Sequence, residues 1–175
     1  NFELIIEKIK KFFRHNCERR SDRMSTNISL IKLFEEVEVL LDIKISSKKR
    51  LFEEIGLCIE EKYGVPRAET FDALFAREKL GSTNIGHGIA LPHGRLKQLK
   101  RFVGVFARLE EPIQFESGDS KPVQMVFVLL TPKVKQQNQH LAYLAHFARV
   151  FSEQSVRNEL LKATGETEVR ALLEK

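Results

Sequence analysis

The segment GSTNIGHGIALPHGR, residues 81–95, is richer in glycine and histidine than the rest of the chain. It holds four of the nine glycines and two of the five histidines. Glycines at this density allow the backbone to adopt positive φ and to come close to a ligand. Pro92 fixes its own φ and holds Leu91 extended, so His93 follows a short rigid segment rather than a flexible loop. A histidine held in this way can serve as a nucleophile, an acid–base group or a metal ligand.

The composition is that of a globular protein. A chain of 175 residues with 42% hydrophobic and 30% charged residues can bury a sizeable core, and its length suggests one domain with an extra segment. No apolar run approaches the ~20 residues that a membrane helix needs, so we expect no membrane insertion. Two cysteines are too few for a disulfide scaffold and favour a cytoplasmic location.

The net charge of +5 is concentrated at the start of the chain. The first 23 residues hold seven basic side chains against four acidic ones, which leaves the remainder close to neutral. This distribution gives little support to a nucleic-acid partner, and we expect none.

Residues 1–23 form a distinct N-terminal extension, and the domain proper is expected to cover residues 24–175. Apolar residues in the extension recur at helical spacing between lysines and arginines, which predicts an amphipathic helix. Three interpretations remain open for it: a helix that binds a membrane surface or a partner, a helix that docks on its own domain, or non-native sequence ahead of a start at Met24.

From Met24 onward the pattern predicts a compact α/β unit. An alternating and then continuously apolar run suggests a strand over residues 36–43. A helix over 47–63 is expected, with Ser46 or Ser47 as its cap, Cys58 on its apolar face and Gly64 beyond its end. A second helix should run from Pro66 to about Leu80 and bury Phe71, Leu74 and Phe75.

The second half predicts two longer strands followed by helices. Strands are expected over 102–109 and 123–130, and the second is so apolar that it should be central in its sheet. Helices are expected over 138–151, 153–163 and 166–174. Helices before and after the strands indicate a mixed sheet with helices on both faces.

His140 is a second candidate for the site. Asn138 can cap the helix that begins there, which would place His140 in the first turn, where free N–H groups and the helix dipole favour an anion. His93 and His140 would each follow a strand, and in open α/β sheets ligands gather beyond strand ends. His146 lies about 120° further round the same helix and is not expected to share a site with His140.

Zinc and phosphoryl chemistry need different surroundings. A catalytic zinc would require a third ligand, and the Gly/Pro context of His87 and His93 offers no helical ligand spacing. A phosphoryl group needs a nucleophilic nitrogen together with cations and N–H donors for its oxygens. Arg77, Arg95 and the hydroxyl-bearing loop around Ser82 supply these, although Arg77 could instead form a surface ion pair with Glu78 or Asp72. His93 is therefore our candidate nucleophile.

These residues resemble a known signature. The run Arg77-Glu78-Lys79-Leu80-Gly81-Ser82-Thr83, followed by Gly86-x-Gly88-Ile89-Ala90-Leu91-Pro92-His93-Gly94, is similar to that of the IIA proteins of the bacterial phosphotransferase system. The similarity is to the fructose/mannitol class and, through the GST-x-IG spelling, to its nitrogen-regulatory branch, IIA-Ntr. It extends from about Ile28 to Leu173 and leaves residues 1–23 outside.

The resemblance implies a function and a set of site residues. It makes His93 the acceptor of a phosphoryl group from an HPr-like carrier, His140 the second histidine of the site, and Arg77 the cation beside the phosphoryl group. The phosphate-binding loop would comprise Ser82, Thr83, Gly88 and Gly94. The implied fold is a three-layer α/β/α domain with a mixed sheet, with no metal or organic cofactor. Regulated targets such as ion transporters or sensor kinases are implied as partners.

The chain departs from the pattern at His87, where asparagine is usual, and at Asn84, usually glycine. Between Gly86 and Gly88 we expect His87 to be an exposed turn residue. Beside the leading hypothesis, a phosphocarrier that regulates other proteins, three alternatives remain: a sugar-specific IIA that passes phosphate to a IIB, a non-catalytic interaction module of the same fold, and a zinc hydrolase.

Overall fold

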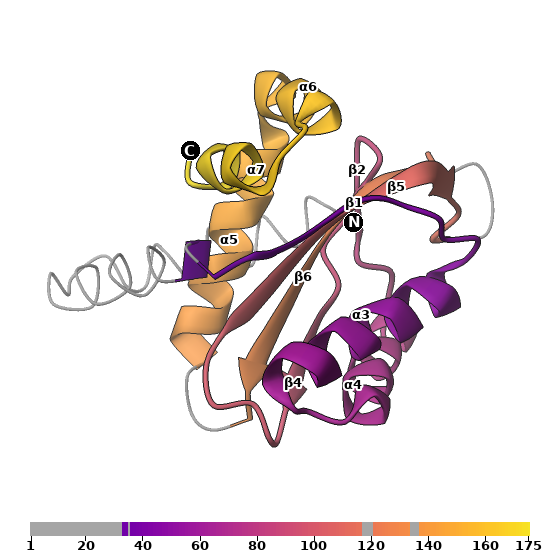
Figure 1. Ribbon diagram of the computed structural model, residues 1–175, viewed down its shortest axis with the longest axis vertical. Helices are drawn as coiled ribbons and strands as arrows, with labels where there is room; N and C mark the ends of the chain where they lie inside the picture. The colour runs from indigo at the N-terminus through magenta and orange to yellow at the C-terminus, as the bar shows by residue number, and fades with distance from the viewer. Residues whose placement is uncertain (1–32, 35, 117–120, 134–136) are drawn as a thin grey trace, which may run out of the picture. The chain divides into compact units, whose positions relative to one another are not determined.

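The computed structural model describes residues 33–34, 36–116, 121–133 and 137–175 (Figure 1). The helix expected in residues 1–23 lies outside these ranges, so the N-terminal extension and the boundary at residue 24 stay predictions. The chain divides into two compact units, one formed by Val37–Lys135 and the other by the residues up to Glu36 together with Gln136–Lys175. In the described ranges no helix is long and apolar enough to cross a membrane.

The Val37–Lys135 unit is built on a six-stranded mixed sheet with the order β1-β5-β6-β3-β2, in which β4 also pairs with β6. The strands are β1 (Glu38–Ile43), β2 (Asn84–Gly86), β3 (Ile89–Ala90), β4 (His93–Leu96), β5 (Val103–Ile113) and β6 (Val123–Pro132). The β6 strand is antiparallel to β5 and parallel to both β3 and β4. The central place expected for the apolar 123–130 run is confirmed.

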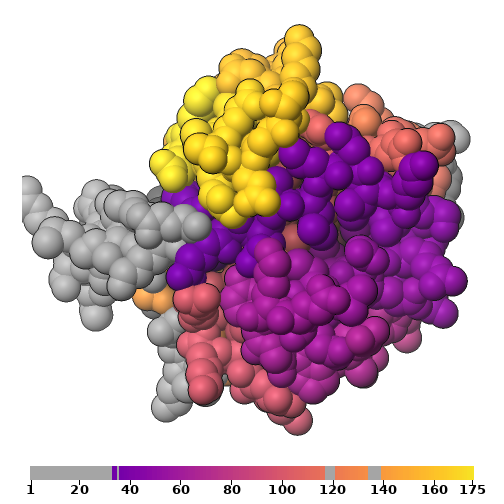
Figure 2. All heavy atoms as spheres, in the orientation of Figure 1, coloured from indigo at the N-terminus to yellow at the C-terminus, as the bar shows by residue number. Residues whose placement is uncertain are grey.

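Two helices of this unit follow β1. The first, α3 (Lys48–Tyr63), begins at Ser47, whose side chain accepts a hydrogen bond from the Arg50 N–H at 3.2 Å. It ends at Gly64, which adopts φ 68° as a left-handed cap. The second, α4 (Arg67–Lys79), lies beside α3, and Figure 2 shows the two as a continuous face of the unit. Both expected helices are confirmed within a residue or two.

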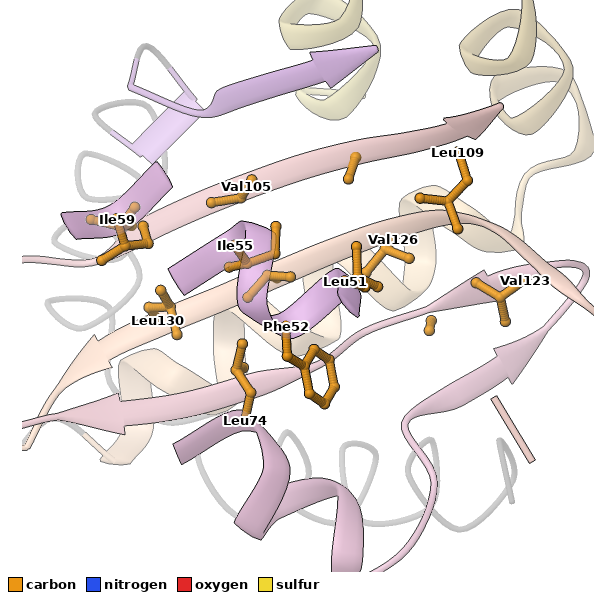
Figure 3. Close-up of a cluster of buried hydrophobic side chains, with 14 of the residues drawn as sticks. Leu51, Phe52, Ile55, Ile59, Leu74, Val105, Leu109, Val123, Val126 and Leu130 are labelled. Atoms are coloured by element: carbon orange, nitrogen blue, oxygen red, sulfur yellow. The ribbon is translucent and has the colours of Figure 1, made fainter. Parts of the chain in front are cut away.

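The core of this unit lies between α3, α4 and the β5–β6 pair (Figure 3). It contains Leu51, Phe52, Ile55 and Ile59 of α3, Leu74 of α4, Val105 and Leu109 of β5, and Val123, Val126 and Leu130 of β6. Each large apolar side chain buried in this way stabilises the fold by about 1.5–3 kcal/mol. Cys58 is also buried, and burial raises the pKa of its thiol, as expected for an inert core residue.

The expected burial of Phe71 and Phe75 is wrong. Both rings are only partly buried, and they stack on each other with centroids 5.5 Å apart. The buried stripe of α4 is instead Thr70, Leu74 and Glu78, spaced four residues apart. The two phenylalanines lie one position further round the helix and therefore cover the edge of the core rather than its centre.

The second unit contains α5 (Gln137–Ser152), α6 (Gln154–Lys162) and α7 (Glu166–Leu173), close to the three helices expected. Phe34 packs edge-on against Phe147 of α5, with ring centroids 5.9 Å apart. His146 ties α5 to α7, since its Nε2 lies 2.9 Å from the Leu173 carbonyl oxygen. Burial lowers the pKa of His146, which favours a neutral ring that donates this hydrogen bond.

Candidate functional site

The glycine-rich segment contains three short strands that the sequence did not reveal. Strands β2 and β3 form a hairpin joined by the turn His87-Gly88, and Gly86, His87 and Gly88 have φ values of 88°, 56° and 77°. Histidine is among the few non-glycine types that occur with some frequency at positive φ. His87 is exposed in this turn, as expected.

The strand pairing places His93 beside the central strand β6. The β3 strand pairs with β6 up to Ala90, and β4 resumes the pairing at His93, opposite Leu129. Between them the Pro92 carbonyl accepts a hydrogen bond from the Leu129 N–H at 3.0 Å. The rigid Leu91-Pro92 link is therefore attached to β6 on both sides, which fixes the backbone of His93.

The expected cation stands against the histidine. Arg77 Nε donates a hydrogen bond to His93 Nε2 at 2.9 Å, and Arg77 Nη1 donates another to the Gly81 carbonyl at 2.8 Å. The structure thus brings Arg77 and His93 together from α4 and β4, and it uses Arg77 there rather than in an ion pair with Glu78 or Asp72.

These contacts define the tautomer of His93. Its Nδ1 lies 2.9 Å from the Leu91 carbonyl oxygen, which can only accept, so Nδ1 carries the proton. The guanidinium of Arg77 can only donate, so Nε2 presents its lone pair. The nucleophilic nitrogen of a neutral His93 is therefore Nε2.

The ring is neutral at physiological pH. Burial lowers the pKa of His93 from 6.5 to about 4, the Leu91 carbonyl acts in the opposite direction, and the positive charge of Arg77 lowers it further. A neutral imidazole is the form that can attack phosphorus, because protonation would remove the lone pair.

Gly94 allows the two elements to meet. A Cβ at this position would lie 3.2 Å from the Cβ of Ala73 on α4, closer than side chains normally pack. The missing side chain lets β4 lie against α4, whose last turn carries Arg77. The expected role of Gly94 in binding phosphate stays a prediction beside this packing role.

The remaining expected loop residues have structural partners. The N–H and Oγ1 of Thr83 both donate to the Glu78 carboxylate, at 3.1 and 2.6 Å. The Ser82 hydroxyl oxygen accepts from the Asn84 N–H at 3.2 Å, and the Gly88 carbonyl accepts from the N–H groups of residues 124 and 125 on β6. Their expected part in holding phosphate is untested by these contacts and stays a prediction.

Sequence reasoning missed Glu78 and Lys48. The Glu78 side chain is only 4% exposed, and the Lys48 ammonium lies 3.1 Å from its Oε1. Lys48 Nζ also donates to the Phe115 carbonyl at 2.6 Å. The signal that could have revealed Glu78 is its spacing from Thr70 and Leu74, which places a carboxylate on the buried stripe of α4.

His140 lies on α5, in the unit that does not contain His93. The helix begins at Gln137, one residue before the expected cap Asn138, and His140 is buried in its first turn. The pairing of His140 with His93, which belong to different units, stays a prediction. In the part of the chain that the structure describes, no three His, Cys, Asp or Glu side chains gather as metal ligands.

Known proteins resemble this chain over most of its length. The family model of the phosphoenolpyruvate-dependent sugar phosphotransferase system, EIIA 2, matches residues 32–175. A nitrogen regulatory protein of Bradyrhizobium diazoefficiens is 41% identical over 122 residues, which are 70% of this chain and 79% of that protein. A nitrogen regulatory protein of Escherichia coli K12 is 37% identical over 132 residues, 75% of this chain and 80% of that protein.

Solved structures lead to the same family. The crystal structure of nitrogen regulatory protein IIA-Ntr from Neisseria meningitidis is 44% identical, with a TM-score of 0.76 over 83% of this chain and 99% of that chain. The mannitol IIA of Escherichia coli, 24% identical with a TM-score of 0.66 over 78% of this chain and 95% of that one, shares the fold. The expected fold of the fructose/mannitol IIA class is confirmed. The chain belongs to the EIIA 2 family of the phosphoenolpyruvate-dependent sugar phosphotransferase system, in its nitrogen-regulatory IIA branch.

Proposed function

We propose that this chain is a regulatory phosphocarrier, which accepts a phosphoryl group on Nε2 of His93 from the phosphohistidine of an HPr-like carrier. Membership of the IIA family supports a phosphotransfer component in general. The observation that carries the finer proposal is the state of His93: a neutral ring, protonated on Nδ1, with the Nε2 lone pair directed at an arginine.

The transfer needs one bond to form and one to break. The lone pair of His93 Nε2 attacks the phosphorus of the donor in line, while the bond between phosphorus and the donor's ring nitrogen breaks and its electron pair returns to that ring. No net oxidation occurs and no cofactor is consumed. The surroundings contribute by positioning and by stabilising charge, which is how catalysed phosphoryl transfer generally proceeds.

Arg77 changes partner during this step. In the resting protein its Nε–H occupies the Nε2 lone pair, and an attack on phosphorus requires that lone pair to be released. The incoming phosphoryl oxygens carry more negative charge than a neutral imidazole and therefore attract the guanidinium more strongly. Arg77 would then hold the oxygens as the new bond forms, with His140 as the second histidine of the site.

Phosphorylation would act as a signal through charge. A phosphoryl group adds nearly two negative charges, which can recruit or repel a partner protein. The nitrogen regulatory proteins among the relatives support a regulatory rather than a sugar-uptake role. We propose regulated targets such as ion transporters or sensor kinases, in the cytoplasm.

The test is the intact mass of the protein after incubation with phosphoenolpyruvate, its dependent kinase and an HPr-type carrier. The wild type should gain the mass of one acid-labile phosphoryl group, and His93→Ala should gain none. His87→Asn is the matched control, because it removes a histidine from the same segment at a position whose positive φ asparagine tolerates. It should be phosphorylated like the wild type.

Two outcomes would count against the proposal. Failure of the wild type to gain mass while the carrier itself is phosphorylated would indicate a non-catalytic interaction module. Efficient onward transfer to a sugar-specific IIB would instead assign the chain to sugar uptake.

A further inference from the structure

A continuous chain of hydrogen bonds joins a buried carboxylate to the imidazole of His93. The Glu78 carboxylate accepts from the Thr83 N–H and hydroxyl, at 3.1 and 2.6 Å. The Thr83 carbonyl accepts from the Leu91 N–H at 2.9 Å. The Leu91 carbonyl in turn faces His93 Nδ1 at 2.9 Å. Two residues, Thr83 and Leu91, each with its N–H towards the carboxylate side and its C=O towards the ring side, thus connect Glu78 to His93.

These bonds give the chain a positioning role. The buried carboxylate fixes the Thr83 backbone, and the Thr83 carbonyl in turn fixes the N–H of Leu91. The Leu91 carbonyl is thereby held where it accepts a hydrogen bond from His93 Nδ1–H. The proton on Nδ1 is therefore favoured, and so is positive charge on the ring.

Lys48 fixes the orientation of the Glu78 carboxylate. It binds Glu78 Oε1, which leaves Oε2 as the acceptor for both donors of Thr83. Lys48 is itself positioned by the Phe115 carbonyl and lies 5.3 Å from the centroid of the Phe115 ring. The carboxylate is thus fixed by groups from α3, α4 and the loop before β2.

We infer that Glu78 is a positioning residue for phosphoryl transfer: acting through the backbone of Thr83 and Leu91, it keeps the proton of His93 on Nδ1 and leaves Nε2 unprotonated as the nucleophile. This inference rests on the proposed function. As Nε2 bonds to phosphorus, positive charge develops on the ring and is shared with Nδ1–H, where the Leu91 carbonyl stabilises it. The logic is that of the aspartate that orients a catalytic histidine in hydrolases, here through the backbones of two intervening residues.

The test compares Glu78→Gln with the wild type by two readouts. The first is the tautomer of His93, measured from the 15N chemical shifts of its ring nitrogens in histidine-labelled protein, with His93→Ala to assign the signals. We expect the wild type to show the Nδ1–H tautomer and Glu78→Gln to show a mixture with Nε2–H. The second is the single-turnover rate of transfer from a phosphorylated HPr-type carrier. It should fall about 10-fold at saturating carrier, with the half-saturating carrier concentration unchanged.

Glu69→Gln is the matched control. Glu69 also lies on α4 and also accepts backbone N–H groups, but these are the N–H groups of Lys97 and Gln98, outside the chain of hydrogen bonds from Glu78 to His93. It should leave both the tautomer and the transfer rate unchanged. Glu78→Gln alone leaves the Lys48 charge without its partner and could unfold the protein. The double variant Lys48→Met/Glu78→Gln removes both charges of the buried pair and should show the same tautomer mixture.

The readouts separate the two proposals. A wild type that takes no phosphate but shows the Nδ1–H tautomer, lost in Glu78→Gln, would overturn the proposed function and leave the role of Glu78 in orienting the ring. A folded Glu78→Gln protein with an unchanged tautomer would overturn the inference, even if wild-type transfer is fast. Equal rate loss in Glu69→Gln would also overturn it, since the effect would then be general to α4.

Discussion

Acidification should destabilise this protein through His93, and the magnitude follows from its surroundings. Burial lowers the pKa of His93 from 6.5 to about 4 in the folded protein. Below pH 6.5 the unfolded chain binds a proton on this residue, whereas the folded ring does not until about pH 4. The free energy of unfolding therefore falls as the pH falls through this window.

The size of the loss can be worked out from the shift. One pKa unit corresponds to about 1.4 kcal/mol, so the full difference would be about 3 kcal/mol once the pH reaches the folded value. At pH 5 the unfolded state is almost fully protonated and the folded state almost fully neutral, which gives about 2 kcal/mol. His93 is partly exposed, so solvent reduces this figure, and we expect about 1–2 kcal/mol.

The assay is urea unfolding at pH 7 and pH 5 for the wild type and His93→Gln. Carboxylates and His146 titrate in both proteins, so the difference between them isolates His93. The advantage of the wild type over the variant should shrink by about 1–2 kcal/mol on acidification. A difference that stays constant, or one that grows at pH 5, would show that the folded ring is readily protonated and would refute the neutral nucleophile.

Three further perturbations test the site. Replacing Arg77 with Met removes the cation that donates to the acceptor ring and should slow single-turnover phosphorylation about 100-fold or more, whereas Arg77→Lys should retain part of the rate. Gly94→Ala would place a Cβ 3.2 Å from that of Ala73, so urea unfolding should show a loss of about 1–3 kcal/mol, and phosphorylation should slow as α4 moves away. Lys48→Met leaves the Glu78 carboxylate buried without its ion-pair partner and should cost about 3 kcal/mol of stability, part of which a second substitution, Glu78→Gln, should restore.

Local signals in the sequence predicted the helices well. Ser47 and Gly64 mark the ends of α3, because a hydroxyl can accept from a first-turn N–H and glycine adopts the left-handed cap at low cost. The apolar run of β6 predicted a central strand, since a strand covered on both faces has no polar alternation. These are properties of a few neighbouring residues, so the sequence contains them directly.

Features that depend on long-range pairing were not predictable in the same way. Strands β2, β3 and β4 are only 3, 2 and 4 residues long, too short for a period to appear, and β3 and β4 form because β6 offers them partners. The stripe of α4 that faces the core was assigned wrongly, because Phe71 and Phe75 are more apolar than the buried Thr70 and Glu78.

The candidate site was found in part. His93 stood out through its glycine and proline context, and Arg77 through its place in the IIA signature. Their contact depends on the close approach of β4 to α4 at Gly94, which sequence spacing does not show. Glu78 was missed because a glutamate between Arg77 and Lys79 is more often part of a solvated ion pair than a buried anchor.

The central claim is that Nε2 of His93 accepts the phosphoryl group. The most direct measurement is NMR of the phosphorylated protein labelled with 15N in histidine, in which the phosphorus couples to the nitrogen that carries it. We predict coupling to Nε2 of His93, with Nδ1 still protonated and bonded to the Leu91 carbonyl. Coupling to Nδ1, or to a nitrogen of any other histidine, would contradict the account.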